Sequence, residues 1–363
     1  MAQQSTSLND AFTEHGIDVV KYSNNQAATI KPFMKYIESY LKQRIYEEGD
    51  RIATKTKLNE LLKDVQAYLS GQYSEWFDEY FLPMLDEFSA EEAVFTDAVF
   101  SNVTPGYSST NVTGEQVLAA AYRNPLIVGG SEVDFGSYTK NFTKNETQRA
   151  ARAISAGFYS GQTTQEIVWS LVGKSSDMTT QGTKKGSVIN MSRANAYSMV
   201  KTSTNHLSSQ AKKIYAKKNN DIIIGILGIS TLDTKTSARC RDYDGEVYLF
   251  EIYGDNYPIP AFHLSCRSTY SYVMSDKYEV LKGNNRTRPA VSEDSDGKAY
   301  AESVPQTQTY YTWLKNQPAA VQDKALGVER GRVFRNAGLS PEEFKAATTN
   351  QFGQELTIEE MRH

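Results

Sequence analysis

The chain is poor in cysteine, tryptophan and histidine, with 2, 3 and 4 of them among 363 residues. Two cysteines exclude a disulfide scaffold and a four-cysteine zinc site. No apolar run of about 18 residues occurs, so no transmembrane helix is predicted. The first residues, MAQQSTSLND, lack the basic and apolar stretches of a signal peptide. We therefore expect a protein of a reducing cytoplasm that has no membrane partner.

Charge varies strongly along the chain. The formal net charge of −4 divides into −8 over residues 1–130, +8 over 131–220 and −4 over the rest. A basic centre between acidic flanks predicts a polyanion or an acidic protein as the partner of residues 131–220. The alternative is a solvated helix face, on which lysines near a helix end interact with the helix dipole.

Hydrophobic periodicity predicts a mostly helical protein. Glycine at position 71 is predicted to end the second helix, and Thr163 or Thr164 to cap a later one. The predicted helices cover 30–45, 58–69, 75–88, 146–159, 164–171 and 192–218, with short helices over 115–122, 310–316, 319–326, 328–337 and 341–348.

The period changes at Asn220. The segments 222–227, 246–250 and 268–274 have the composition of short strands. The predicted fold class is therefore α+β, mostly α-helical, with a small few-stranded α+β module near residues 220–275.

Changes in composition divide the chain into four predicted segments. Residues 1–130 are an N-terminal helical region, and 131–275 are a core of helices followed by the α+β module. Residues 276–308 are polar, with glycine and proline, and are typical of a linker or mobile loop. Residues 309–363 are a C-terminal helical tail.

Motifs for catalysis are weak. Gly173-Lys174-Ser175 lacks the glycine five positions earlier that a phosphate-binding loop needs, and no G-x-S-x-G elbow occurs. Among the histidines, His363 is terminal, His15 is expected in a frayed N-terminus, and His206 is expected to be structural. We predict no enzyme and no catalytic residue.

Cys240, His263 and Cys266 form the one cluster with metal-ligand chemistry, because thiolate and imidazole are the ligands that zinc prefers. Asp233, Asp242, Asp244 or a water would then be the fourth ligand. We favour a structural cluster of buried thiols and a hydrogen-bonded imidazole, without a cofactor. Zinc binding is the first alternative and a disulfide is the second.

The segment 230–273 resembles the signature of the Mu-type phage head morphogenesis (minor head, or minor capsid) protein family. The family pattern has Thr-x-Asp-x-x-Thr-Ser, then Cys-Arg, Asp-Gly, a proline-rich turn and His-x-x-Cys-Arg-Ser. The matching residues are Thr231, Asp233, Thr236, Ser237, Cys240, Arg241, Asp244, Gly245, Pro258, Pro260, His263, Cys266, Arg267 and Ser268. The tail over 313–340 also resembles the C-terminal ends of minor head proteins.

This resemblance implies a portal-associated virion protein of a tailed bacteriophage that acts in head assembly, and in DNA packaging or ejection. The implied partners are the portal protein and the major capsid or scaffold proteins, with double-stranded DNA bound through residues 131–220. The implied location is the head interior or portal vertex, and the host cytoplasm during assembly. One alternative is a DNA-binding protein ejected with the genome. Another is an ADP-ribosyltransferase or nuclease-like effector, for which residues 276–363 are too short.

The same signature predicts a local polar network. Asp233 and Asp244-Gly245 are turn formers, and Thr236-Ser237 can cap a helix or satisfy backbone donors. The planar guanidinium groups of Arg241 and Arg267 can donate to the aspartate carboxylates. We expect this network to stabilise a small module that has little apolar core.

Overall fold

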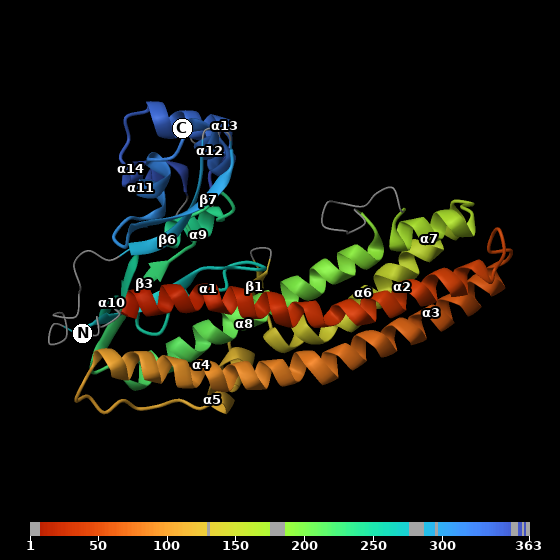
Figure 1. Ribbon diagram of the computed structural model, residues 1–363, viewed down its shortest axis with the longest axis horizontal. Coiled ribbons are helices and arrows are strands. Elements are labelled where there is room, and N and C mark those ends of the chain that lie inside the picture. Colours follow the sequence, from red (N-terminus) through yellow and green to blue (C-terminus); the bar gives the residue numbers. More distant parts are fainter. Residues whose placement is uncertain are drawn as a thin grey trace. The chain divides into compact units, whose positions relative to one another are not determined.

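Helices make up most of the computed structural model, which describes residues 8–128, 131–174, 186–275, 287–294, 297–349, 355–357 and 359–360. Its strands form one three-stranded sheet and two hairpins (Figure 1). The predicted fold class, a mostly helical α+β protein with a small module near 220–275, is confirmed. Among the described helices, none has the length and apolarity that crossing a membrane requires.

The helices vary widely in length. In chain order they are α1 (Leu8–Ala27), α2 (Lys31–Tyr46), α3 (Lys55–Trp76), α4 (Leu82–Val103), α5 (Gly114–Arg123), α6 (Phe135–Tyr159), α7 (Thr164–Val172), α8 (Val188–Lys218), α9 (Ala238–Tyr243), α10 (Phe250–Tyr253), α11 (Tyr310–Lys315), α12 (Ala319–Leu326), α13 (Val328–Asn336) and α14 (Pro341–Thr348). A 3-10 turn, Ala28–Ile30, joins α1 to α2, and a π-helical segment, Phe77–Phe81, joins α3 to α4.

The strands are all short. They are β1 (Leu126–Val128), β2 (Ser131–Val133), β3 (Ile223–Ile229), β4 (Val247–Leu249), β5 (Thr269–Met274), β6 (Thr287–Glu293) and β7 (Ala299–Pro305). The predicted strands 222–227, 246–250 and 268–274 correspond to β3, β4 and β5, so the strands of the module are confirmed.

Two compact units divide the chain, and each is assembled from separate segments. The helical unit comprises Val20–Glu91 and Gly114–Leu207. The sheet unit comprises Met1–Val19, Glu92–Thr113 and Ser208–His363. The units therefore do not follow the sequential division at residues 130 and 275, because α1, α4 and α8 each contribute residues to both.

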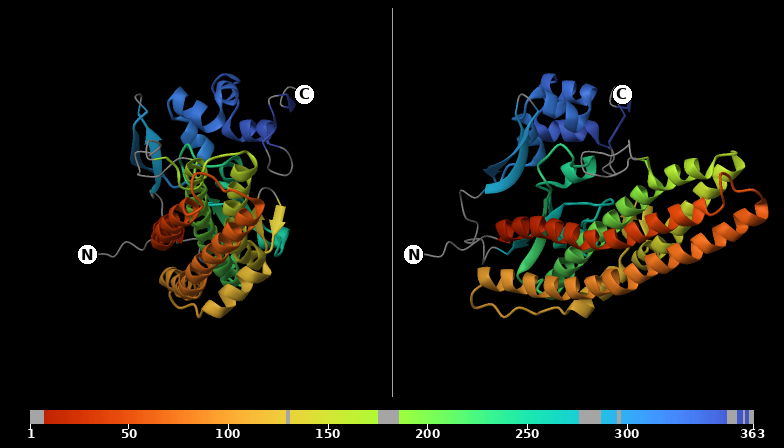
Figure 2. Two further views of the ribbon diagram at one scale, coloured as in Figure 1. Left: turned by 90° about the vertical axis from the view of Figure 1, so that its right-hand side faces the viewer. Right: turned by 45° about the vertical axis from the view of Figure 1, so that its right-hand side comes forward.

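In the helical unit, α2, α3, α6 and α7 lie side by side (Figure 1, Figure 2). α3 packs against α2 and α6, and α7 packs against the same two helices. The buried side of α3 consists of Leu58, Leu61, Val65, Leu69, Tyr73 and Trp76. The prediction that Gly71 ends this helix is wrong. The helix continues to Trp76, because the buried stripe runs on past that exposed glycine.

Aromatic rings fill the deepest part of the helical unit. The ring centroids of Tyr73 and Trp76 both lie 5.6 Å from that of Phe142 on α6. Close packing also needs Gly157 on α6, because a Cβ there would lie 2.5 Å from Cγ1 of Ile167 on α7. α7 begins at the predicted cap Thr163, which forms a capping box.

In the sheet unit, β3 is the central strand of an antiparallel sheet with the order β4-β3-β5. The short helices α9 and α10 lie in the connections that follow β3 and β4. This sheet carries the residues of the family signature, since α9 lies between β3 and β4 and the histidine-cysteine loop leads into β5.

The segment predicted as a linker, 276–308, contains the antiparallel hairpin β6–β7 instead. Residues 276–286 and 295–296 lie outside the described part of the chain. The inward side chains of β6 are Arg288, Ala290 and Ser292. Because they are charged, small and polar, the strand does not show the apolar alternation by which strands are predicted.

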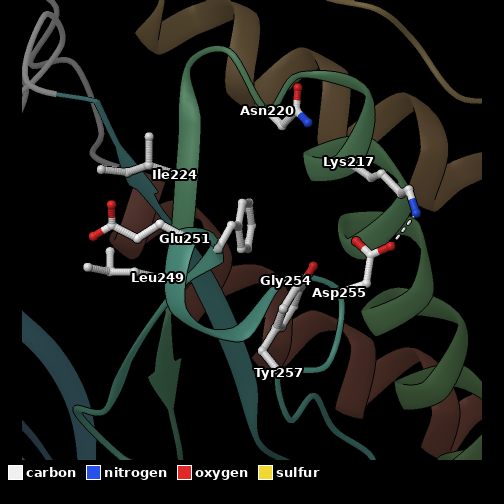
Figure 3. A pocket seen from close by; sticks show the side chains of 9 residues that line it. Lys217, Asn220, Ile224, Leu249, Glu251, Gly254, Asp255 and Tyr257 are labelled. Carbon is white, nitrogen blue, oxygen red and sulfur yellow. Dashed lines mark hydrogen bonds and ion pairs between the residues drawn. The ribbon is translucent and has the colours of Figure 1, made fainter.

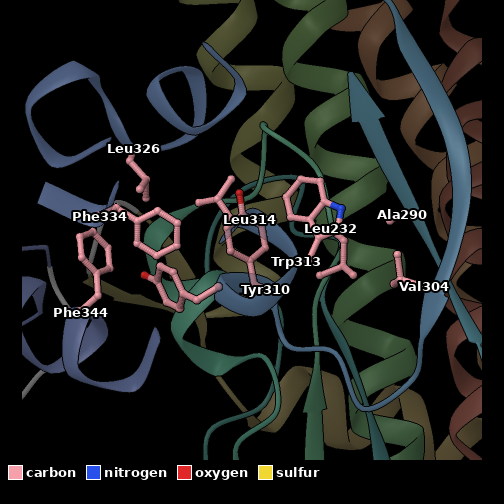
Figure 4. Packing of buried hydrophobic residues seen from close by; sticks show 10 residues of the cluster. Leu232, Ala290, Val304, Tyr310, Trp313, Leu314, Leu326, Phe334 and Phe344 are labelled. Carbon is pink, nitrogen blue, oxygen red and sulfur yellow. The ribbon is translucent and has the colours of Figure 1, made fainter. Parts of the chain in front are cut away.

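The hairpin and the tail helices share one buried cluster (Figure 4). Figure 4 shows Trp313, Tyr310 and Leu314 of α11 at its centre, with Phe334 of α13 and Phe344 of α14 beside them. Leu232 joins the cluster from the signature segment, and its carbonyl accepts a hydrogen bond from Val291 N–H at 2.8 Å. The four predicted tail helices correspond to α11–α14.

Candidate metal centre

Cys240 is positioned by the first turn of α9. Of the pair Thr236-Ser237, predicted to cap or to satisfy backbone donors, Ser237 caps this helix, and its hydroxyl accepts the Cys240 N–H at 3.4 Å. The capped turn holds the Cys240 side chain in the interior, where 2% of the residue is exposed. The predicted cap therefore fixes one sulfur of the cluster.

His263 and Cys266 are positioned by a turn just before β5. The Cys266 N–H donates to the His263 carbonyl at 3.2 Å. Ser265, between them, has a φ of 57°, a left-handed conformation that non-glycine residues seldom adopt. This turn directs both side chains toward Cys240, with Cys266 buried and His263 half-buried.

The three predicted residues come together. Cys240 Sγ lies 3.2 Å from His263 Nε2 and 3.7 Å from Cys266 Sγ, and the three ligand atoms all lie within 4.8 Å of one another. A disulfide needs sulfurs about 2.05 Å apart. Both cysteines are therefore free thiols here, and the disulfide alternative does not describe this structure.

The other ring nitrogen of His263 sets its tautomer. Nδ1 lies 2.9 Å from the carbonyl oxygen of Leu264, to which only a protonated nitrogen can donate. In the neutral ring this leaves the lone pair on Nε2, the atom that faces Cys240. The imidazole is thus held in the form that can act as a ligand.

The two thiols differ in acidity. The hydrogen bond to Cys266, together with burial, raises the pKa of Cys240 well above its usual value. Burial also opposes ionisation of Cys266, but the bond from Cys240 and backbone bonds at Phe262 and Ser268 lower its pKa to about 7. The hydrogen bond to Cys240 raises the pKa of His263. Of the two thiols, Cys266 therefore ionises to a thiolate more readily.

None of the three carboxylates predicted as a fourth ligand joins this cluster, because each has another partner within the described chain. Arg267 donates to the two oxygens of Asp233 at 2.6 and 2.9 Å. Asp242 accepts from the Tyr311 hydroxyl at 2.7 Å. Asp244 accepts from Arg288 at 2.9 and 3.0 Å.

The Arg267–Asp233 pair is the predicted local network. Although burial opposes it, the guanidinium group of Arg267 lowers the pKa of Asp233, and the Thr236 hydroxyl and Lys235 N–H also donate to this carboxylate. The carboxylate side chain is 11% exposed and the guanidinium side chain 32%. The pair therefore holds the turn after β3 against the strand β5.

Asp244 is the more buried carboxylate, with none of its side chain exposed. Besides Arg288, it accepts the Ser230 N–H at 2.6 Å and the Tyr310 N–H at 2.8 Å. These bonds join the end of α9, the strands β3 and β6 and the helix α11. Asp244 is thus a junction between these four elements of the sheet unit.

Arg241 does not pair with an aspartate, which corrects the predicted network. Its guanidinium group donates to the carbonyls of Thr236 at 3.1 Å and Ala325 at 2.8 Å, and it pairs with Glu355. The guanidinium group therefore joins the signature helix α9 to the tail, through α12 and the segment that contains Glu355.

Sequence reasoning missed Arg288, Tyr310, Tyr311 and Glu355, which complete this network. Arg288 lies in a polar stretch, and nothing near it in the sequence marks a buried residue. One sequence signal points to such partners. If Asp233 and Asp244 are both buried, their two carboxylates need more hydrogen-bond donors than Arg267 alone supplies.

The basic segment 131–220 is not one cationic patch. Lys212 is 1% exposed, and burial lowers its pKa to about 8. Lys217 pairs with Asp255, and Lys218 donates to the Asn111 carbonyl at 2.8 Å. On α6, in contrast, Lys140, Lys144 and Arg152 are exposed. Among the described residues of this segment, α6 therefore carries most of the exposed cations that a polyanion could contact.

Two other histidines have structural partners. His206 is buried, and its Nε2 lies 3.0 Å from the Ala121 carbonyl, in line with its predicted structural role. His15 lies inside α1 rather than in a frayed terminus, because its ring stacks on Phe95 at 3.5 Å and its Nε2 lies 2.5 Å from Glu92. His363 lies outside the described residues.

A separate cavity of about 670 Å³ lies beside β4 and α10 (Figure 3). Ile224, Leu249 and Tyr257 line it, and its charged pair, Lys217 and Asp255, face each other in Figure 3. Glu251 and Asn220 line it as well, so the wall of the cavity combines apolar and polar side chains.

Comparison of the chain with protein-family models, with curated proteins and with solved structures found no match.

Proposed function

We propose that this chain is a minor head protein of a tailed bacteriophage, portal-associated and active in head assembly. The observation that carries this proposal is the meeting of the signature residues in one small module. Cys240, His263 and Cys266 contact one another, and Arg267 pairs with Asp233. Because the residues of the signature contact one another in the folded chain, they belong to one structural unit, and this supports the resemblance on which the proposal rests.

A structural role, without enzymatic activity, fits the chemistry of that module. The aspartates and arginines of the signature are bonded to internal partners: Asp233 to Arg267, Asp244 to Arg288, and Arg241 to Glu355. Residues that act on a substrate must present such groups to it. These contacts instead hold strands, loops and tail together.

The proposed partners are the portal protein and the major capsid or scaffold proteins, met in the host cytoplasm during assembly and kept in the virion. The edge formed by β4 and α10 supports a protein partner. Val247, Ile252 and Tyr253 on it are 47%, 69% and 42% exposed. Apolar side chains gathered on one surface segment are typical of an interaction site.

Double-stranded DNA is a second proposed partner, favoured by the exposed cations of α6. Lys140, Lys144 and Arg152 recur at intervals of four and eight, so they follow one another along the helix surface. Contacts to phosphates would make binding salt-dependent and independent of sequence. A binding constant that does not change with salt would contradict this part of the proposal.

Quantitative mass spectrometry of purified virions and of ghosts emptied of DNA tests the function. Retention in ghosts at a few copies per portal is the expected result. Loss with the genome would favour the alternative of an ejected DNA-binding protein and contradict portal anchoring. Absence from both particles would contradict the proposal of a virion protein.

A further inference from the structure

We propose that Cys240, His263 and Cys266 bind one Zn²⁺ ion, with a water in the fourth coordination position. Two thiolates and an imidazole are a donor set that selects zinc over the hard cations magnesium and calcium. The three residues come from two segments, the helix α9 and the loop before β5, so the ion would cross-link them. The site is independent of the proposed role in head assembly.

The spacing of the ligand atoms fits a tetrahedral ion. Zinc–sulfur bonds of about 2.3 Å and zinc–nitrogen bonds of about 2.0–2.1 Å place two sulfurs roughly 3.8 Å apart and a sulfur and a nitrogen roughly 3.5 Å apart. The observed distances are 3.7 Å between the sulfurs and 3.2 Å from Cys240 Sγ to His263 Nε2. Shifts of a few tenths of an ångström bring these two distances to the tetrahedral values, and the third pair, Cys266 Sγ and His263 Nε2, lies within 4.8 Å and would close to roughly 3.5 Å around the ion.

The surroundings of His263 have the form of a metal site's outer shell. Ligating histidines usually donate their second ring N–H to a carbonyl or carboxylate, which fixes the ring and its tautomer. Nδ1 of His263 has such a partner in the Leu264 carbonyl at 2.9 Å. Its Nε2 then carries the lone pair, on the side of the ring that faces Cys240.

The fourth position is left for water because the nearby acids have other partners. Asp233 is bonded to Arg267, Asp242 to Tyr311 and Asp244 to Arg288. His263 is half-buried, and Leu264 next to it is 42% exposed, so solvent reaches this side of the cluster. Three protein ligands and one open position form an established arrangement for zinc.

A bound ion would supply what the loop lacks. Between α10 and β5, residues 254–268 contain no helix or strand, although they are all described. Phe262 packs this loop on Tyr243 of α9, with ring centroids 4.7 Å apart, but the sulfurs of Cys240 and Cys266 contribute only a weak thiol hydrogen bond. Metal ligation would replace this weak bond and couple zinc binding to the folding of the sheet unit.

The full chain, purified under reducing conditions and dialysed with zinc, tests the site by its metal content. We expect one zinc ion per chain after removal of loosely bound metal. Replacement of zinc by Co²⁺ should give a thiolate-to-cobalt charge-transfer band and the strong visible bands of tetrahedral cobalt. A folded protein that holds no zinc and gives no charge-transfer band would overturn the proposal.

Variants locate the ion. Cys266→Ser and His263→Ala should weaken zinc binding by at least the roughly 10–100-fold that loss of an outer-shell partner costs. Leu264→Ala is the matched control, since it lies between the two ligands, is exposed and should bind zinc like the wild type. Equal zinc content in all three variants would overturn the assignment.

Alkylation of the wild-type thiols gives the same test if a ligand variant does not fold. Zinc should slow the alkylation of both cysteines, and a chelator should reverse this protection. Alkylation unaffected by zinc would contradict the site.

Discussion

The two compact units are stabilised by different kinds of interaction. The helical unit is held mainly by apolar stripes and packed aromatic rings, as on α3, where Leu61, Val65 and Leu69 are fully buried. The buried Glu146 carboxylate of this unit pairs with the partly exposed Arg149. The sheet unit contains buried ion pairs, a buried lysine and a thiol–imidazole cluster in addition to its apolar core. This difference has a consequence for stability. Trimming an apolar side chain lowers the free energy of unfolding in proportion to the cavity that it leaves, whereas removing one partner of a buried ion pair leaves an uncompensated charge.

Removal of Arg288 should have the largest effect. Arg288→Ala leaves the fully buried Asp244 carboxylate without its cation, which costs roughly 3–5 kcal/mol of the free energy of unfolding. Urea unfolding measures the loss. Arg332→Ala is the control, because its pair with Glu329 is more than half exposed and contributes about 0–1 kcal/mol. Equal stability of the two variants would contradict a polar junction at Asp244.

A cavity in the helical unit gives the apolar counterpart. Leu61→Ala removes a fully buried side chain from α3 and should cost about 2–5 kcal/mol, depending on how far the neighbours relax. The same urea titration measures it, with the exposed Lys63→Ala on α3 as control. A loss below about 1 kcal/mol would show that α3 is not part of a close-packed core.

Arg267→Ala should cost less than Arg288→Ala, about 1.5–3 kcal/mol, because this pair is partly exposed. Arg267 lowers the pKa of Asp233, so the contribution of the pair is complete above the ordinary carboxyl pKa of about 4 and is lost as the pH falls below it. The variant should therefore lose less stability on acidification than the wild type. Thermal unfolding at several pH values measures this, and parallel curves would contradict the pairing.

His206 should make the helical unit sensitive to a higher pH range. Burial lowers the pKa of His206 from 6.5 to about 4, so between these values the unfolded chain binds a proton that the folded chain does not. Stability is complete above pH 6.5 and should fall by about 2 kcal/mol from about pH 7 to about pH 5. His206→Gln should flatten this slope in urea titrations, and an unchanged slope would show that His206 does not cause it.

The smallest expected effect is the loss of one helix cap. Thr163→Ala removes the hydroxyl that accepts the Glu166 N–H at the start of α7, at a cost of about 0.5–2 kcal/mol. Thr163→Ser keeps the hydroxyl and serves as the control in the same denaturant titration. A serine variant as unstable as the alanine variant would mean that the cap itself contributes little.

The sequence allows the helices and the main sheet to be predicted because their signals are local. Apolar spacing marks α2 and α3, and Thr163 marks the start of α7. The cluster of Cys240, His263 and Cys266 was also predictable, since only these residues combine the two cysteines with a nearby histidine.

The remaining features depend on partners far along the chain. Arg288 is 44 residues from Asp244 and lies in a strand whose inward positions are polar, so the hairpin β6–β7 was predicted as a linker. The compact units were also not predictable from segment boundaries, because long helices such as α8 contribute to both. The local sequence pattern does not indicate which distant residue donates hydrogen bonds to a buried carboxylate.

Hydrogen exchange of the wild type and Arg288→Ala, followed by mass spectrometry of peptides, tests this account of the sheet unit most directly. We predict that the amides of β6, β7 and α11 lose protection in the variant, because β6 loses its bond to Asp244 and the buried carboxylate, which also accepts the Tyr310 N–H of α11, is left without its cation. Amides in α3 and α6 should keep theirs. Unchanged protection of β6, β7 and α11 would contradict the claim that this buried polar junction holds the sheet unit together.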